Sequence, residues 1–224
     1  MPYPFASSAP GAREINLAIR GGVPAGRRLL VTGFGPFPGI PRNPSAEVAR
    51  LVAASPRWRR LGIEARALVL PTTYAALDAV LAPALAEGFD AVLMIGVAGR
   101  ARRVRVERRA ANRASILHGD AARRRPARLA EPGLAPFRRC PADPHRVAAA
   151  LRARGVPAAP SQDAGRYLCN ASYLQALGGA APALFLHIPK APRRRGWAHA
   201  LARAFEAAGL ELLRLSRIRP VRPR

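Results

Sequence analysis

The sequence DAGRYLCNASYLQAL, residues 163–177, is the stretch around which the rest of the chain can be interpreted. Small residues at its start favour a turn, and Leu168, Leu174 and Leu177 then recur near helical spacing, which predicts a helix. Cys169 falls in the first turn of this helix, where backbone N–H groups lack intrahelical partners and the helix dipole is positive. A cysteine in that position can be held partly as the thiolate, its nucleophilic form. The alternative is a small buried cysteine in a packed helix.

Strand and helix patterns alternate on both sides of this stretch. Apolar or alternating runs predict strands at residues 29–32, 63–70, 90–96, 103–107, 156–159, 183–188 and 210–215. Helical spacing and capping residues predict helices at residues 44–54, 73–88, 144–155, 168–177 and 197–208. This order indicates an α/β fold, a single-domain three-layer α/β/α sandwich around a mainly parallel, twisted sheet. In such sheets ligand sites lie at the carboxyl ends of the strands.

Turn and capping residues set the boundaries of these elements. Asn43 has a side chain that favours a helix N-cap, so the first helix is expected to begin directly after it. Gly209 is expected to end the last helix, because glycine is favoured at helix C-termini, and to precede the final strand. Residues 118–141 are polar, arginine-rich and irregular, which predicts one long functional or mobile loop.

The chain is expected to divide into a short extension and one domain. Residues 1–26 are rich in Pro, Gly, Ala and Ser without sustained periodicity, and we expect a poorly ordered N-terminal extension there. Residues 27–224 are then a single α/β domain, and the total of 224 residues suffices for one sizeable core.

Arginine dominates the charge of the chain. The formal net charge is +24, and 36 of the 37 basic residues are arginine, with Lys190 as the only lysine. Such a charge is compatible with nucleic-acid binding. The arginines occur in nearly every segment and form no single tail. We therefore interpret them as a general bias in composition, with weak and non-specific affinity for nucleic acid.

No feature of the sequence predicts membrane insertion. The apolar run at residues 75–85 is too short to span a bilayer and is broken by Asp78 and Pro83. Residues 1–25 lack the apolar core of a signal peptide. Two cysteines do not make a disulfide framework, and Cys140 is expected to be incidental in a loop. We therefore expect a cytoplasmic protein with reduced thiols.

A cysteine nucleophile needs a base, and the base needs an orienting group. Of the four histidines, only His187 lies on a rigid element and at the edge of the sheet where ligand sites form, since it is at the carboxyl end of the strand at 183–188. The alternative is a hydrogen-bonded histidine of the core. Glu107 is the candidate for the orienting group because it is an acid on the neighbouring basic strand at 103–107. The alternative for Glu107 is an ion pair with the surrounding arginines.

Cofactor and metal motifs are weak or missing. Residues 96–99, GVAG, follow a predicted strand, and their N–H groups could hold an anion or a substrate carbonyl. They lack the full dinucleotide-binding pattern, and the chain has no phosphate-loop lysine motif and no Cys and His cluster with metal-ligand spacing. We therefore expect neither a cofactor nor a metal.

Four segments, taken in order, resemble a known family. They are VTGFGPFPG at residues 31–39 with NPS at 43–45, residues 96–112 centred on Glu107, AGRYLCN at 164–170, and FLHIP at 185–189. Together they resemble the pyroglutamyl peptidase I family, the pyrrolidone-carboxylate peptidases, which are cysteine peptidases. The resemblance extends over roughly residues 29–208, and it is specific because all four segments occur in the family's order.

The resemblance implies an activity and a set of site residues. It implies that Cys169, His187 and Glu107 form a catalytic triad that removes an N-terminal pyroglutamyl residue from a peptide through an acyl-enzyme. It implies a substrate-binding set of Phe34, Phe37, Asn43, Gly96, Val97 and Leu168, with the two phenylalanines against the lactam ring. The implied partner is a peptide with a blocked N-terminus, and the implied assembly is a homodimer or homotetramer.

The chain departs from the family pattern at two positions near the site. The family usually carries glutamine where this chain has Val97, and glycine where it has Arg100. Loss of one oxyanion donor costs about 3 kcal/mol of transition-state stabilisation. The departures favour a divergent member, and two alternatives stay open: a weak or inactive homologue that binds a lactam or another blocked N-terminus, and a basic nucleic-acid-binding protein.

Overall fold

Three mainly apolar runs form adjacent strands at the centre of the molecule, and their composition fits strands buried on both faces. The computed structural model describes residues 26–37, 40–117, 119–127, 130–190 and 196–216. The extension expected at residues 1–26 lies, apart from Gly26, outside the described residues.

The central sheet is mainly parallel, as expected. The strands are β1 (Arg27–Phe34), β2 (Ile63–Leu70), β3 (Ala91–Val97), β4 (Val104–Glu107), β5 (Arg109–Ala111), β6 (Phe137–Arg139), β7 (Ala158–Ser161) and β8 (Ala183–Ile188). Among the described residues, six of them form one sheet in the order β2-β1-β3-β8-β4-β7, while β5 pairs with β6. β4 is antiparallel to β8, and the other neighbours in the six-stranded sheet are parallel.

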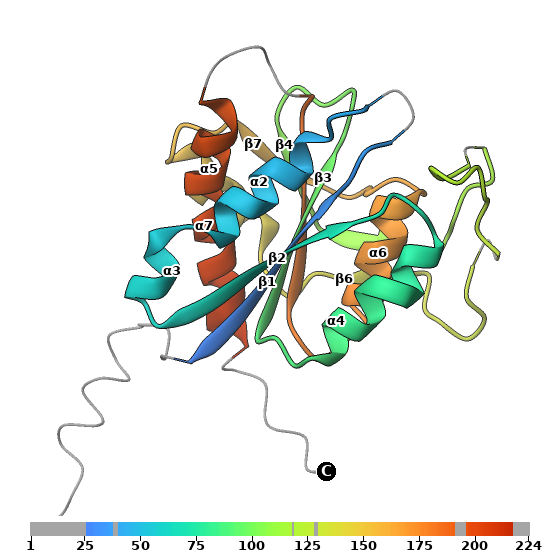
Figure 1. The fold of residues 1–224 in the computed structure, drawn as a ribbon, viewed down its shortest axis with the longest axis horizontal. Coiled ribbons are helices and arrows are strands. Elements are labelled where there is room, and N and C mark those ends of the chain that lie inside the picture. The colour runs from blue at the N-terminus through green and yellow to red at the C-terminus, as the bar shows by residue number, and fades with distance from the viewer. Residues whose placement is uncertain (1–25, 38–39, 118, 128–129, 191–195, 217–224) are drawn as a thin grey trace, which may run out of the picture.

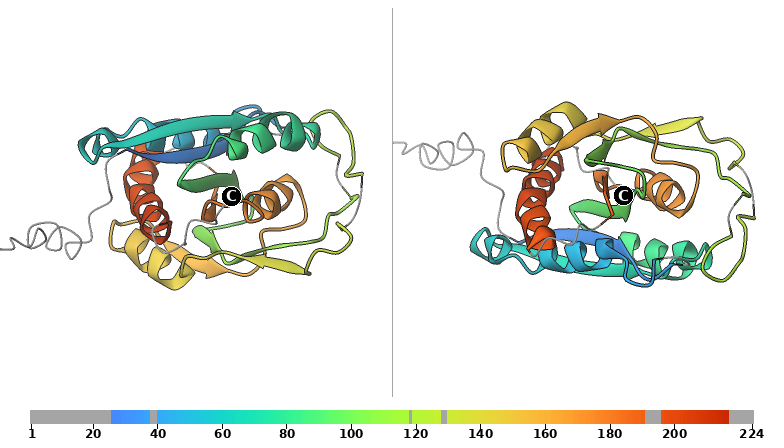
Figure 2. Two further views of the ribbon diagram at one scale, coloured as in Figure 1. Left: turned by 90° about the horizontal axis from the view of Figure 1, so that it is seen from below. Right: turned by 90° about the horizontal axis from the view of Figure 1, so that it is seen from above.

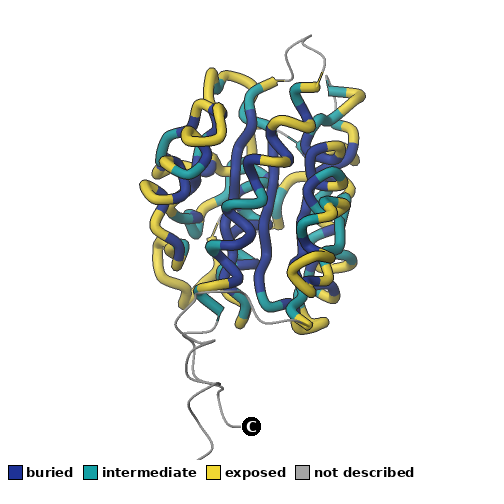
Figure 3. Tube along the Cα trace, turned by 90° about the vertical axis from the view of Figure 1, so that its left-hand side faces the viewer, coloured by how far each residue is buried: buried dark blue, intermediate teal, exposed yellow. Residues whose placement is uncertain are grey.

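Helices cover both faces of this sheet. They are α2 (Pro44–Ala53), α3 (Pro56–Arg60), the π-helical turn η1 (Leu77–Leu81), α4 (Ala82–Ala86), α5 (Pro144–Arg152), α6 (Leu168–Ala176) and α7 (Trp197–Leu215). α2, α3, α5 and α7 lie on one face, and η1, α4 and α6 lie on the other (Figures 1 and 2). The strands form the buried centre between these layers (Figure 3). The structure therefore confirms the three-layer α/β/α sandwich.

The start of α2 is held against the end of β1. Asn43 is the N-cap of α2, as predicted, and its Oδ1 accepts a hydrogen bond from the N–H of Ser45 at 3.1 Å. The N–H of Phe34 in turn donates to the Ser45 hydroxyl at 3.0 Å. The approach requires glycine at position 33, because a Cβ on Gly33 would stand 2.5 Å from the carbonyl oxygen of Ser45. This contact fixes where the chain leaves the sheet beside the candidate site.

The predicted end of the last helix at Gly209 is wrong. α7 continues to Leu215, so the strand predicted at residues 210–215 is the last part of this helix. Gly209 is buried inside the helix, and a Cβ there would stand 3.0 Å from Trp58 and 3.1 Å from Leu29. The glycine therefore serves close packing of α7 on the sheet rather than helix termination.

Three further boundaries differ from the sequence prediction. The strand expected at residues 156–159 spans Ala158–Ser161. The loop expected at residues 118–141 contains β6, which has no apolar pattern of its own and pairs with β5, with the Arg109 guanidinium 3.8 Å from the Phe137 ring centroid. The helix expected at residues 73–88 contains η1, a π-helical turn directly before Pro83, which lacks the N–H of a regular helix.

Candidate active site

The candidate base and acid meet across the one antiparallel pair of the six-stranded sheet. The Nδ1 of His187, on β8, lies 2.8 Å from the Oε1 of Glu107, on β4. Both side chains are buried, with Glu107 at 0% and His187 at 5% exposure. The half-exposed strand predicted at residues 103–107 is therefore wrong at Glu107, because α6 covers this face of the sheet and its Tyr173 hydroxyl donates to the Glu107 carbonyl at 3.0 Å.

Cys169 reaches the same place from α6. It lies in the first turn of that helix, as the pattern predicted, and its Sγ lies against the backbone of Gly96. Gly96 on β3 is the register partner of His187 on β8. The helix start thus brings the thiol beside the strand that carries the imidazole, and the interaction with Cys169 raises the pKa of His187.

The pKa of His187 reflects these two neighbours. Burial by itself lowers that pKa, because it disfavours the charged imidazole. The hydrogen bonds and charges of Cys169 and Glu107 outweigh burial and raise the pKa of His187 to about 9. The ring is therefore an imidazolium near neutral pH, with Nδ1 directed at Glu107 and Nε2 left for Cys169. Such a ring can stabilise a thiolate and can later give a proton to an amine leaving group.

Glu107 also forms the ion pair that was its alternative interpretation. The Nε of Arg105 lies 3.3 Å from the same Oε1 that faces His187. Arg105 is held in turn by the Ser161 hydroxyl at 2.7 Å and the Asp163 carbonyl at 2.6 Å. Within the described residues, Oε2 of Glu107 has no hydrogen-bond partner. The carboxylate is therefore fixed by two cations through one oxygen.

Two aromatic side chains with no role predicted from the sequence lie in a row beside the imidazole. The ring centroid of Phe185 lies 4.7 Å from that of His187, and the ring of Tyr173 lies 5.6 Å from Phe185. Period-two spacing on β8 was the available signal, since Phe185 and His187 share one face. Tyr173 follows Cys169 by four residues, so both lie on one side of α6.

The two predicted phenylalanines have different positions. Phe34 is 3% exposed and belongs to the core beneath η1, α4 and α6. Phe37 is partly exposed, and its ring lies 5.7 Å from Tyr167, which directly precedes α6. Tyr167 packs edge-on against Tyr74 at 5.9 Å and donates to the carbonyl of Gly119 at 2.9 Å. Burial raises the pKa of Tyr167 to about 12, so this tyrosine is neutral.

The other predicted binding residues belong to β3, to α6 and to the N-cap of α2. Val97 is the last residue of β3 and pairs with Ile188, and Leu168 is a 1% exposed core residue directly before Cys169. Asn43 is engaged in capping α2. The expected N–H cradle at residues 96–99 is reduced, because the N–H of Ala98 donates to the Ile188 carbonyl at 2.9 Å.

Asn170 is a structural support for which the sequence alone predicts no role. Its Oδ1 accepts from the N–H of Ala111 at 2.8 Å, and its Nδ2 donates to the Ala111 carbonyl at 2.8 Å. The side chain thereby replaces a strand partner for β5 and ties the start of α6 to the segment after Glu107. Its place beside the cysteine in AGRYLCN was the only signal for it.

The second cysteine is not part of the proposed triad. The Sγ of Cys140 donates to the carbonyl of Ala183 at 3.3 Å, and burial raises the pKa of this thiol to about 11. Among the described residues, no group of three or more His, Cys, Asp or Glu side chains is placed to hold a metal ion. Nor does any helix in the described part of the chain combine the length and the apolar composition that a membrane span requires.

Comparisons with known proteins agree on one family. The sequence model described as pyroglutamyl peptidase matches residues 27–200. The pyrrolidone-carboxylate peptidase of Streptomyces coelicolor is 36% identical over 204 residues, which cover 83% of this chain and 89% of that protein. The protein of the same name from Gloeobacter violaceus is 38% identical over 176 residues, covering 75% of this chain and 83% of its own length.

Solved structures give the same result. The pyrrolidone carboxyl peptidase of Thermus thermophilus superposes with a TM-score of 0.71 at 31% identity and covers 83% of this chain and 99% of its own. The pyroglutamyl peptidase I of Bacillus amyloliquefaciens superposes with a TM-score of 0.72 at 25% identity, covering 84% of this chain and 97% of its own.

Proposed function

This chain belongs to the pyroglutamyl peptidase family, and we propose that Cys169, His187 and Glu107 are the residues with which it removes an N-terminal pyroglutamyl residue from peptides. It is a cysteine-type peptidase that acts on peptides whose N-terminus is a pyroglutamyl lactam. One observation supports the assignment of residues above all: a buried imidazole hydrogen-bonded to Glu107, with its pKa raised by the neighbouring thiol of a helix-start cysteine.

The proposed reaction has two steps. The Cys169 thiolate attacks the carbonyl carbon between the lactam residue and the next residue, forming a carbon–sulfur bond. The His187 imidazolium gives its Nε2 proton to the leaving nitrogen, and the carbon–nitrogen bond breaks. Water then attacks the thioester while His187 takes a proton from it, which releases pyroglutamate and restores the thiolate. Glu107 keeps Nδ1 protonated and the ring oriented throughout.

Backbone N–H groups at the start of α6 are the proposed oxyanion donors. The N-cap residue, Tyr167, makes no side-chain capping bond, so it does not take up the N–H groups of the first turn. Cys169 belongs to that turn, and a carbonyl bound to its sulfur has its oxygen close to these donors. Val97 has no side-chain donor, so the backbone must supply most of this stabilisation.

The lactam is proposed to bind on the β1 side of Cys169. Phe37 and Tyr167 offer adjacent aromatic faces there, and a flat neutral lactam packs well against such faces. Phe34 supports this surface from the core, and Asn43 lies at the nearby N-cap of α2. Gly96, Val97 and Leu168 complete the proposed binding set as backbone and apolar walls.

Release of a fluorophore from a pyroglutamyl amide in the presence of a reductant tests the proposal. The Cys169→Ala variant should show no turnover, and the Cys140→Ala variant should keep turnover, because Cys140 lies outside the triad. Equal turnover by the wild-type and Cys169→Ala proteins excludes the triad. Binding of pyroglutamate in calorimetry without turnover identifies instead an inactive lactam-binding homologue, the alternative favoured by Val97.

Three properties of the whole protein complete the proposal: its domain extent, its assembly and its location. We propose a single domain over residues 27–224, an assembly as a homodimer or homotetramer, and a cytoplasmic location that keeps both cysteines reduced. Limited proteolysis tests the first, light scattering during gel filtration tests the second, and fractionation of cells tests the third.

A further inference from the structure

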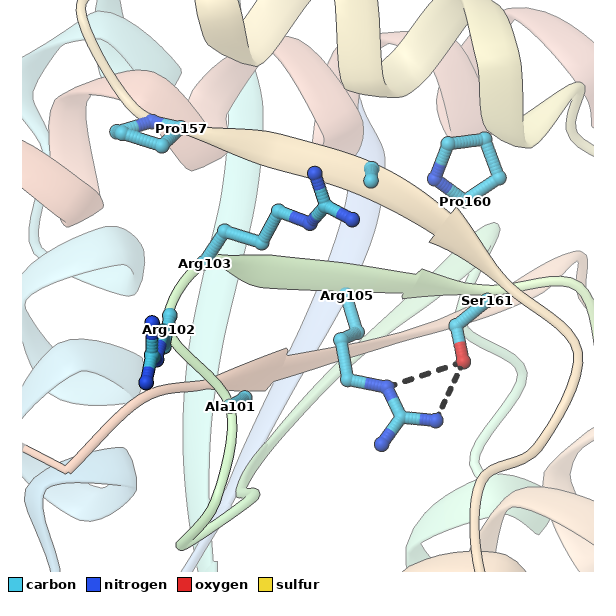
Figure 4. Close-up of a pocket in the computed structure, with 8 residues that line it drawn as sticks. Ala101, Arg102, Arg103, Arg105, Pro157, Pro160 and Ser161 are labelled. Carbon is cyan, nitrogen blue, oxygen red and sulfur yellow. Dashed lines mark hydrogen bonds between the residues drawn. The ribbon is translucent and has the colours of Figure 1, made fainter.

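A groove lined by arginines lies beside the proposed triad. It has a volume of about 650 Å³ and runs over the starts of β4 and β7 (Figure 4). Its lining includes Arg102, Arg103, Arg105, Ala159 and Ser161. Figure 4 shows the three arginines following one another along β4 and the segment before it, with the Arg105 guanidinium turned toward Ser161.

Strand register places this groove in line with the reacting atoms. Gly96, His187, Arg105 and Ala159 are consecutive register partners across β3, β8, β4 and β7. Side chains alternate along a strand, so Arg105 points to the same face as Glu107, the face on which Cys169 lies. On the opposite face, α5 packs against β4 and β7. The groove is thus the outer part of the same sheet face that holds the triad.

The direction of the substrate follows from the proposed chemistry. The lactam lies on the β1 side of Cys169, whereas the proton for the leaving nitrogen comes from His187 on β8. The leaving peptide must therefore extend past His187, toward β4 and β7. Neighbouring strands are about 4.8 Å apart, so Ala159 lies about 10 Å beyond His187 in this row. An extended peptide spans that distance in about three residues.

The charge of the groove indicates which kind of ligand can bind there. Arg102 and Arg103 are exposed, and within the part of the chain that the structure describes neither forms an ion pair. The side chain of Arg105 is 37% exposed and shares the charge of Glu107. No carboxylate side chain is among the residues that line the groove. A ligand with carboxylates of its own would complement this surface.

We propose that this arginine groove binds aspartate or glutamate side chains at the second and third residues after the scissile bond, so that the enzyme prefers pyroglutamyl peptides with an acidic start. The inference rests on the proposed peptidase function, because that function gives the direction of the peptide. Arg102 and Arg103 are the specificity-determining residues, and Arg105 links the groove to the triad.

Matched peptides test the preference. The peptides pGlu-Ala-Asp-Asp-Gly and pGlu-Ala-Asn-Asn-Gly differ only in charge, and release of pyroglutamate is followed by chromatography at low salt. Two exposed charge pairs should raise kcat/KM of the aspartate peptide roughly fivefold to tenfold over the asparagine peptide. In the Arg102→Gln/Arg103→Gln variant this ratio should fall to about twofold or less, the remainder being due to the general positive charge. Equal kcat/KM for the two peptides with the wild-type enzyme overturns the proposal.

A remote pair of arginines provides the control. Arg59 and Arg60 are exposed on α3, at the edge of the sheet opposite the site. The Arg59→Gln/Arg60→Gln variant loses the same charge and should keep most of the preference. If both double variants lose the preference equally, diffuse charge is the cause and the groove is not a binding site.

A binding measurement separates this proposal from the proposed function. Fluorescein-labelled forms of the two peptides are titrated into the Cys169→Ala protein, and tighter binding of the aspartate peptide, reduced by the groove variant, supports the groove even without turnover. Cleavage of neither peptide by the wild-type protein counts against the peptidase function alone. Equal affinity for both peptides counts against the groove alone.

Discussion

The Sγ of Cys169 occupies the space that a side chain would need at Gly96, because a Cβ there would stand 2.9 Å from the sulfur. The same Cβ would stand 2.7 Å from Cζ of Phe185, whose ring packs on His187. Gly96→Ala should therefore shift both the nucleophile and the ring that supports the base. We expect kcat on a pyroglutamyl amide to fall by about 10- to 100-fold, since displacements of an ångström have effects of this size.

Gly99→Ala is the matched control for this substitution. Among the described residues, its Cβ would meet only Cε of Lys190 at 3.4 Å, an ordinary contact with a flexible side chain. We expect kcat within about twofold of wild type, because packing changes of this size are tolerated. Equal losses in the two variants would show that the contact with Cys169 has no special role.

The raised pKa of His187 predicts the alkaline limit of activity. In the proposed mechanism the leaving nitrogen receives this proton, so kcat/KM should fall as the pH rises through about 9. The free energy of unfolding should depend on the same protonation of His187. The folded pKa lies above the value of about 6.5 in the unfolded chain, so this contribution is fully present below about pH 6.5 and is lost as the pH rises toward 9. A pH profile of kcat/KM, together with urea unfolding at several pH values, measures both effects.

Glu107→Gln removes the negative charge of the carboxylate but keeps the shape of the side chain. The amide can still accept the hydrogen bond from Nδ1 of His187, but the negative charge that helps to raise the His187 pKa is gone. The alkaline limit should therefore move to lower pH, and kcat should fall about 10- to 100-fold within the range of general acid–base effects. An unchanged alkaline limit in this variant would assign the ionisation to a group other than His187.

The two thiols should differ sharply toward alkylating reagents. The raised pKa of Cys140, about 11, keeps that thiol protonated at neutral pH, and its Sγ is engaged by the Ala183 carbonyl. Cys169 faces an imidazolium, which stabilises the reactive form. Iodoacetamide at pH 7.5 should label Cys169 at least about 100-fold faster than Cys140, as followed by peptide mass spectrometry. Labelling of both at one rate would contradict the assignment of Cys169 as the nucleophile.

Local sequence patterns singled out residues of the proposed triad because each of them lies near the end of a recognisable element. Cys169 follows a turn into an apolar helix, and His187 ends an apolar strand, so both positions follow from local periodicity. The bond between Glu107 and His187 joins residues 80 positions apart on antiparallel strands, and no local pattern gives that register. The family resemblance supplied this pairing.

The features that sequence patterns missed depend on tertiary packing. β6 forms because β5 and the Arg109 side chain provide its partners, and the burial of Glu107 depends on coverage by α6. The arginine groove requires β4 and β7 to be neighbours, although they are distant in sequence. Gly209 has the residue type of a helix end, but its lack of a side chain is used against Trp58.

Gly209→Val tests whether α7 depends on that close approach. A Cβ at this position would stand 3.0 Å from Cη2 of Trp58 and 3.1 Å from Cδ2 of Leu29, and a branched side chain adds two methyl groups where both neighbours are buried. Overpacking should lower the free energy of unfolding by about 1 to 3 kcal/mol, measured by urea denaturation. Ala200→Val, at an exposed position of the same helix, should cost only about 0.5 kcal/mol from helix propensity. Helix propensity alone favours valine over glycine, so a Gly209→Val variant as stable as wild type would show that packing does not require glycine there, whereas a loss of stability shows that the helix needs glycine to lie close to the sheet.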